Sequence, residues 1–335
     1  MVSAPELANH RPSTNIASRT ITSFFACLDR RQLAGDKGGY SISVPNDQTQ
    51  SLVDTHVHFW DRAVDGLRWA WLEPGFTHPR LDRLPEIAAD RYAVEEFQRD
   101  SEGCGTTKIV HIQAAKAVDP PIETAWLQQM SAASRWPNAV VGYTNLAAPN
   151  AADVVLSHLQ FPIFRGVRDL PAGEHLDEPA VVRGFNAVAA LGVPIEVMTS
   201  WPNFGHVRDL AAANPEVTVI LGHSGLPVTR DADYLARWRP AMREIAQLPN
   251  VVCKISALAS GADPNWTVPS IAPWFLGCVE AFGAGRCMLG TNWPIDSLFS
   301  EYPQLIRAYR EIASCLSDSE QADLFVNTAT RVYRL

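Results

Sequence analysis

A short segment with two histidines two residues apart is the first candidate for chemistry. Residues 52–60 read Leu-Val-Asp-Thr-His-Val-His-Phe-Trp. The alternation predicts a strand on which Asp54, His56 and His58 share one face. Two imidazoles that point the same way can hold one metal ion or one substrate oxygen. A hydrogen-bonded pair without a chemical role is the alternative, and the rest of the chain has to decide between them.

Composition limits the classes of protein that need to be considered. Of the 335 residues, 47% are hydrophobic and 19% are charged, which is typical of a folded globular protein. The net charge of −8 argues against nucleic acid and anionic membranes as partners, and no apolar run is long enough to span a membrane. The six cysteines form no Cys-x-x-Cys pair, and we find no secretory signal pattern. We therefore expect a cytoplasmic protein that acts on a small molecule.

The first fifty residues differ from the remainder. Residues 1–50 are rich in Ser, Thr, Asn, Gly and Pro and show no sustained period, apart from an apolar patch over 21–28. We interpret them as a partly irregular N-terminal extension that precedes one folded domain over residues 51–335. The apolar patch would suit a contact in a homodimer.

The folded part alternates short β-branched runs with helical stretches. The eight apolar runs lie at 52–56, 108–113, 139–144, 164–168, 194–198, 217–223, 251–256 and 286–292. Two helices are expected over 301–315 and 319–332, the second with a cap at Ser317. Eight strands that alternate with helices predict an α/β fold, the (β/α)8 TIM barrel. An open, doubly wound sheet is the rival, but no glycine fingerprint follows the first strand.

Polar side chains accumulate at the ends of the predicted strands, where a barrel of this kind has its active site. They are His56, His58, Gln113, Arg165, Arg168, His223 and Asn292. Three histidines on one rim indicate function rather than packing. Arg165 and Arg168 are three residues apart, so at most one points inward from an ideal strand. An inward arginine would suit a carboxylate. Three tryptophans also follow predicted strands and could flank a ring-shaped substrate. They are Trp60, Trp201 and Trp293.

Six segments occur in a familiar order along these strands. They read VDTHVHFWD, FRGVRDL, VILGHSGLP, VCKIS, LGTNWP and NTATRVYRL. The set resembles the amidohydrolase superfamily, and most of all its lactonase branch, which includes fuconolactone, sulfomuconolactone and pyrone-dicarboxylate lactonases. The resemblance covers roughly residues 52 to 335.

The resemblance implies roles for individual residues. His56, His58 and His223 match histidines that can ligate a metal in the family. Arg165 and Arg168 match positions that hold substrate carboxylate or lactone oxygens. Asn292 stands where the family has an aspartate that serves as general base and can also bind the metal.

Two departures from the family pattern bear on the metal and the base. The Asn292 amide cannot accept a proton near neutral pH, so Asp296 in the same loop is an alternative base. Gln113 lies where some metal-binding relatives carry a glutamate. Two alternatives stay open: one divalent ion, zinc or manganese, on His56, His58 and His223, or no cofactor.

The favoured function is hydrolysis of a lactone by an activated water. The substrate would be a small carboxylate-bearing or sugar-derived molecule, held by the arginines, Gln113 and the three tryptophans. Two other functions stay open. One is non-oxidative decarboxylation of an aromatic acid on the same fold. The other is a barrel that binds a ligand without turnover, because Asn292 replaces the expected aspartate.

Overall fold

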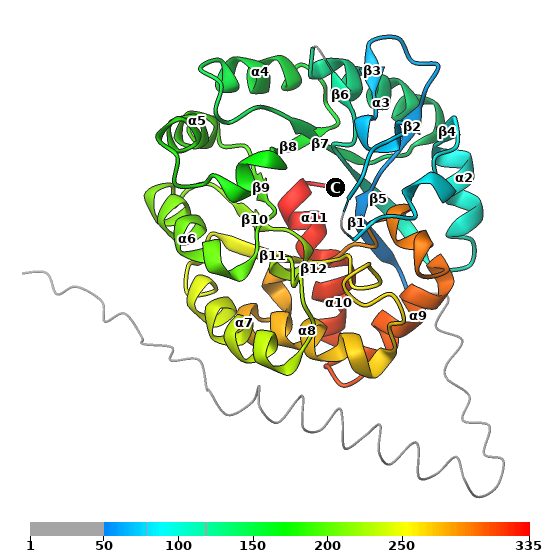
Figure 1. Ribbon diagram of the computed structural model, residues 1–335, viewed down its shortest axis with the longest axis vertical. Helices are drawn as coiled ribbons and strands as arrows, with labels where there is room; N and C mark the ends of the chain where they lie inside the picture. The colour runs from blue at the N-terminus through cyan, green and yellow to red at the C-terminus, as the bar shows by residue number, and fades with distance from the viewer. Residues whose placement is uncertain (1–49, 79, 118) are drawn as a thin grey trace, which may run out of the picture. The chain divides into compact units, whose positions relative to one another are not determined.

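The eight predicted strands form one parallel sheet. The computed structural model describes residues 50–335 except 79 and 118. The strands are β1 (Leu52–Val57), β5 (Thr106–Ile112), β7 (Ala139–Tyr143), β8 (Phe164–Arg168), β9 (Ile195–Val197), β10 (Val219–Leu221), β11 (Val251–Ile255) and β12 (Cys287–Leu289). Their order in the sheet follows the sequence, and a parallel bridge between Val57 and Trp293 brings the last strand back to the first. The predicted (β/α)8 barrel is confirmed (Figure 1).

Helices surround the strands on the outside (Figure 1). They are α2 (Val94–Asp100), α3 (Pro121–Ser134), α4 (Ala151–His158), α5 (Pro179–Ala189), α6 (Phe204–Ala213), α7 (Ala232–Ile245), α8 (Val268–Phe282) and α9 (Tyr302–Ala313). In α9, Leu305, Tyr309 and Ile312 are buried at helical spacing, which gives the helix one apolar face. The short helices α2 and α4 were not among the predicted elements.

The last helix packs against inward side chains of the barrel, and a short helix precedes it. α10 (Asp318–Ala322) begins at Ser317, whose Oγ accepts a hydrogen bond from the Glu320 N–H, so the predicted cap is confirmed. A π-helical turn over 323–327 leads into α11 (Thr328–Tyr333), which lies across the centre of the ring of strands in Figure 1. Ala329 and Tyr333 of α11 are buried in one apolar cluster with inward side chains of the strands, Val53 of β1 among them.

The connection between β1 and α2 is long and folds on itself. Strand β2 (Trp60–Asp61) pairs with β4 (Arg91–Tyr92), and β3 (Leu67–Arg68) pairs with β6 (Lys116–Ala117) beyond β5. A second apolar cluster, which includes Trp60, Trp69 and Leu72, supports this connection. It can therefore hold side chains in fixed positions above the barrel.

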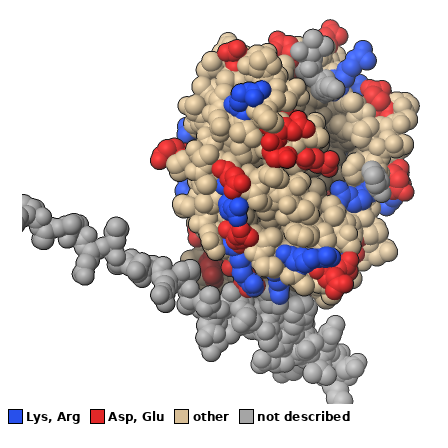
Figure 2. Space-filling model, turned by 60° about the vertical axis from the view of Figure 1, so that its left-hand side comes forward, with Lys and Arg blue, Asp and Glu red and all other residues tan. Residues whose placement is uncertain are grey.

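The sequence also led to expectations about the N-terminal extension, membrane spans and surface charge. Residues 1–49, and with them the expected homodimer contact over 21–28, lie outside the described residues. No helix in the described part of the chain is long and apolar enough to cross a membrane. On the face in Figure 2, the described Lys and Arg side chains lie among Asp and Glu side chains and form no patch of one charge.

Candidate active site

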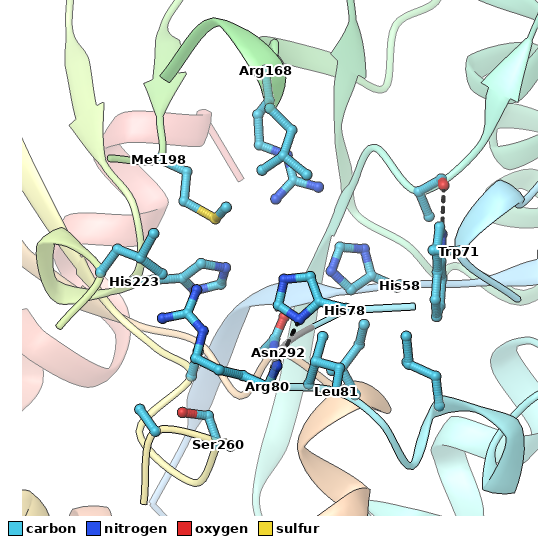
Figure 3. Close-up of a pocket in the computed structure, with 18 of the residues that line it drawn as sticks. His58, Trp71, His78, Arg80, Leu81, Arg168, Met198, His223, Ser260 and Asn292 are labelled. Carbon is cyan, nitrogen blue, oxygen red and sulfur yellow. Dashed lines mark hydrogen bonds between the residues drawn. The ribbon is translucent and has the colours of Figure 1, made fainter. Parts of the chain in front are cut away.

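A cavity of about 360 Å³ lies at the carboxyl ends of the strands. Five of the sequence-predicted site residues line it. They are His58, Gln113, Arg168, His223 and Asn292. Figure 3 shows Arg168 and His223 pointing toward His58 and Asn292 from different strands of the barrel. Side chains that are far apart in the sequence therefore meet at the position expected for the active site of a barrel.

His56 does not line the cavity and faces His58, which does. Their Nε2 atoms are 3.1 Å apart, and His58 Nδ1 lies 2.9 Å from the Ile112 carbonyl oxygen. That carbonyl can only accept, so His58 carries its proton on Nδ1 and its Nε2 accepts from the Nε2–H of His56. The ring of His223 lies 4.4 Å from that of His56, centroid to centroid. Its Nδ1 is 2.8 Å from Ser256 Oγ.

This arrangement leaves one pair of buried atoms unsatisfied. His56 Nδ1 and Glu196 Oε1 face each other at 3.6 Å, and neither has a hydrogen-bond partner. A proton on His56 Nδ1 would satisfy both atoms, but it would leave two lone pairs opposed between the histidines. With the His56 proton on Nδ1, one more proton or a cation between the two Nε2 atoms would give His56 Nδ1, Glu196 Oε1 and both Nε2 atoms a partner.

The fit to a metal ion is therefore partial. His56 and His58 have the donor atoms and the supporting acceptors of metal ligands. However, no group of three His, Cys, Asp or Glu side chains in the described part of the chain is arranged to hold an ion. The described residues do not make up a complete metal site, and no step proposed below is assigned to an ion.

The charges around the cavity are mostly positive. Arg168 is buried, and its Nη2 donates to the Gln113 carbonyl oxygen at 2.6 Å. Lys254 is buried beneath the histidines and pairs with Glu196 Oε2 at 2.5 Å. Burial, reinforced by these cations, lowers the pKa of His56, His58 and His223 well below its usual range. All three imidazoles are consequently neutral near pH 7.

Asn292 separates Asp296 from the cavity. Asn292 Nδ2 donates to Asp296 Oδ1 at 2.8 Å, and Asp296 is fully buried without lining the cavity. Burial raises the pKa of the Asp296 carboxyl well above its usual range. Burial disfavours the charged, proton-accepting form of this carboxyl, and the carboxyl does not line the cavity, so it is poorly placed to act as the base.

The loops that carry these groups have unusual backbone conformations. His223, Ala257 and Asn292 follow β10, β11 and β12, and all three have φ between 51° and 61°. Such values are uncommon for residues with a Cβ and cluster at functional sites. Gly290 is also required, because a Cβ there would lie 2.7 Å from the Cβ of His56.

Comparisons with known proteins agree with this geometry. Residues 53–335 match the amidohydrolase family model. The chain belongs to the amidohydrolase family. An uncharacterised protein of Sinorhizobium fredii is 32% identical over 298 residues, which are 85% of this chain and 99% of that protein. An L-fucono-1,5-lactonase of Burkholderia multivorans is 30% identical over 306 residues, which are 84% of this chain and 96% of that enzyme.

A solved structure shows the same relationship. A crystal structure of an amidohydrolase from Burkholderia multivorans with bound zinc matches with a TM-score of 0.72 at 27% identity, over 85% of this chain and 100% of that chain. Together these matches confirm the resemblance to the amidohydrolases and their lactonase branch.

Four residues that the sequence suggested for substrate binding do not line the cavity of this amidohydrolase. Arg165 points away from it and donates to the Pro162 and Phe164 carbonyl oxygens. The indole N–H groups of two tryptophans are held elsewhere, Trp60 by the Ala89 carbonyl oxygen and Trp293 by Asp100. Trp201 lines a separate cavity beside α6 and α7. A place at a strand end does not reveal which way the chain turns next.

The connection between β1 and α2 supplies residues that the sequence analysis missed. Trp71, Phe76, His78 and Arg80 all line the cavity. The Trp71 indole N–H donates to the Ala114 carbonyl oxygen at 2.8 Å, which ties this connection to the end of β5. These residues follow no period, and a long loop after the first strand was the only signal that could have drawn attention to them.

Proposed function

We propose that this amidohydrolase opens a lactone ring by hydrolysis and that its substrate is a small molecule with a carboxylate. One observation carries the proposal: His58, His223 and Arg168 converge in a cavity that no Asp or Glu of the described residues lines. Such a cavity favours an anion and an oxygen atom on which negative charge develops. The 30% identity to an L-fucono-1,5-lactonase supports lactone hydrolysis in particular.

Arg168 would stabilise the charge that forms on the lactone carbonyl oxygen. Its guanidinium is buried and fixed by the Gln113 carbonyl oxygen, so it needs no rearrangement when water attacks the carbonyl carbon. The neighbouring imidazoles are neutral and cannot balance a charge by themselves. Arg168 therefore carries the main electrostatic contribution in this proposal.

His223 would accept the proton of the attacking water. Its Nδ1 lies 2.8 Å from Ser256 Oγ, and when Nδ1–H donates to that oxygen, Nε2 is free to accept a proton. The tetrahedral intermediate then collapses, the ring C–O bond breaks, and the proton passes to the leaving oxygen. The product is an open-chain hydroxy acid. This assignment moves the base from Asp296, which lies behind Asn292, to His223.

β8 offers a matched pair of variants for the test. Arg168→Met removes the cavity charge, whereas Arg165→Met removes a charge from the same strand outside the cavity. We expect Arg168→Met to lower kcat/KM for lactones by about 100-fold or more, as for loss of one oxyanion donor, and Arg165→Met to leave it within about threefold. Acid release in weakly buffered indicator solution measures the rate, and thermal unfolding shows whether each variant is folded.

The same preparations separate the alternatives. Release of carbon dioxide from an aromatic acid, with no lactone opened, would favour the decarboxylase. Binding of the hydroxy acid without turnover of any lactone would favour the ligand-binding barrel. Equal losses in the two arginine variants would contradict the role given to Arg168.

A further inference from the structure

The cavity contains a cation that the reaction proposed above does not use. Arg80 comes from the connection between β1 and α2, and Figure 3 shows its guanidinium beside His223, across the cavity from Arg168. No side chain or carbonyl of the described residues makes a hydrogen bond or ion pair with that guanidinium, whereas Arg230 in the same wall donates to the Ala257 and Leu258 carbonyl oxygens. An unpaired guanidinium in a cavity suits a planar carboxylate of a ligand.

The outer part of the same cavity is apolar. Phe76 and Leu170 line it and are 42% and 41% exposed, although large apolar side chains are mostly buried in this protein. Leu81 and Met198 also line the cavity (Figure 3) and are less exposed than Phe76 and Leu170. These side chains are continuous with the site itself, so the occupant that would cover them is an apolar substituent of the substrate.

The charged side chains that line the cavity offer no acceptor to the hydroxyl groups of a sugar. Hydroxyl hydrogens need acceptors, and arginine side chains have none. Of the neutral polar side chains that line the cavity, Ser260 Oγ already accepts from Arg230 at 3.2 Å, and Gln113, whose amide N–H donates to the Ala115 carbonyl oxygen at 2.8 Å, has only its Oε1 left to accept. No described Asp or Glu side chain is available in the lining to replace them.

We infer that the substrate is an amphipathic lactone, with a carboxylate held by Arg80 and an alkyl or aryl substituent held between Phe76 and Leu170, rather than a polyhydroxylated sugar lactone. This inference rests on the lactone hydrolysis proposed above. It gives Arg80 the role of selecting the substrate, while Arg168 stabilises the charge formed during the reaction.

Three lactones of equal ring size test the inference. The first carries a carboxylate and a phenyl group, the second carries the primary amide in place of the carboxylate, and the third is an aldonolactone. We expect kcat/KM to fall in that order. Arg80→Gln should lower the value for the first lactone by about 10- to 100-fold and that for the amide by no more than about threefold. Arg80→Lys should restore part of the loss.

Arg68→Gln is the matched control, because Arg68 lies in the same connection and is exposed in β3. It should change none of the three values. Preference for the aldonolactone, or an equal effect of Arg80→Gln on acid and amide, would overturn the inference and leave lactone hydrolysis intact. If no lactone is opened, the proposed function fails. In that case, calorimetry measures the affinity of the site for the hydroxy acids that correspond to the first and third lactones. We expect the acid with the phenyl group to bind at least about tenfold more tightly than the aldonic acid.

Discussion

Replacing the buried Glu123 by glutamine should stabilise the protein at alkaline pH and not at acidic pH. Glu123 lies in the first turn of α3, and its Oε1 accepts hydrogen bonds from the Ala114 and Ala115 N–H groups at 3.0 and 2.8 Å. Ala114 and Ala115 line the cavity. Burial raises the pKa of Glu123 from 4.5 to about 7. Glutamine keeps an acceptor oxygen for the two N–H groups and carries no charge to desolvate.

The sign and size of the effect follow from proton binding. Between pH 4.5 and about 7, the folded protein keeps the Glu123 proton while the unfolded chain releases it. The unfolded state then binds fewer protons, so the free energy of unfolding falls as pH rises through this interval. At about 1.4 kcal/mol per pKa unit, the interval from 4.5 to about 7 amounts to at most about 3–4 kcal/mol. The cost is fully present above about pH 7 and absent well below pH 4.5.

Urea unfolding near pH 5 and near pH 8 measures this difference. Glu123→Gln should match the wild type within about 1 kcal/mol near pH 5 and exceed it by about 1–3 kcal/mol near pH 8. Glu95→Gln is the control, because Glu95 is exposed on α2 and should show no such trend. A variant that is equally or less stable than the wild type at the higher pH would refute the reasoning.

Two further predictions concern the groups beneath the cavity. Lys254→Met leaves the Glu196 carboxylate buried and unpaired, so we expect the free energy of unfolding, measured with urea, to fall by about 3–5 kcal/mol. Adding Glu196→Gln should recover part of this loss. A loss under about 1 kcal/mol would contradict the buried pair. Asn292→Asp brings a carboxyl against Asp296, with which it would share one proton, and gives the histidines an anionic neighbour. Zinc or manganese retained after dialysis, measured by mass spectrometry, should rise above the wild-type level, whereas Asn292→Ala should show no rise.

The barrel could be predicted from the sequence because its strands are buried on both faces. A run such as Val251–Ile255 is buried at every position, and all its residues except Lys254 are apolar, so it stands out between helices of clear period. Two short helices of the outer ring gave no such signal: α2 has seven residues and α4 has eight, which is about two turns. Among the helices of the outer ring, length rather than composition decided which were predicted.

The site was predictable only where the strands position it. His58, His223 and Arg168 sit at strand ends, and the closure of the barrel brings them together without further information. Trp60 also follows a strand, but its indole N–H is bonded to a carbonyl of its own loop, away from the cavity. Arg80 was missed for the opposite reason, since the path of a long connection depends on tertiary contacts and not on any local period.

The change from aspartate to Asn292 fits the charge of the cavity. The resemblance described above implies an aspartate at this position, where it would serve as the general base. Here Asn292 donates to the Asp296 carboxyl, four residues later, which is buried, has a raised pKa and does not line the cavity. The cavity thereby keeps the positive charges of Arg80 and Arg168 without a negative group beside them. An anionic lactone would be repelled by a carboxylate at position 292, so the same substitution that removes the expected base also favours an acidic substrate.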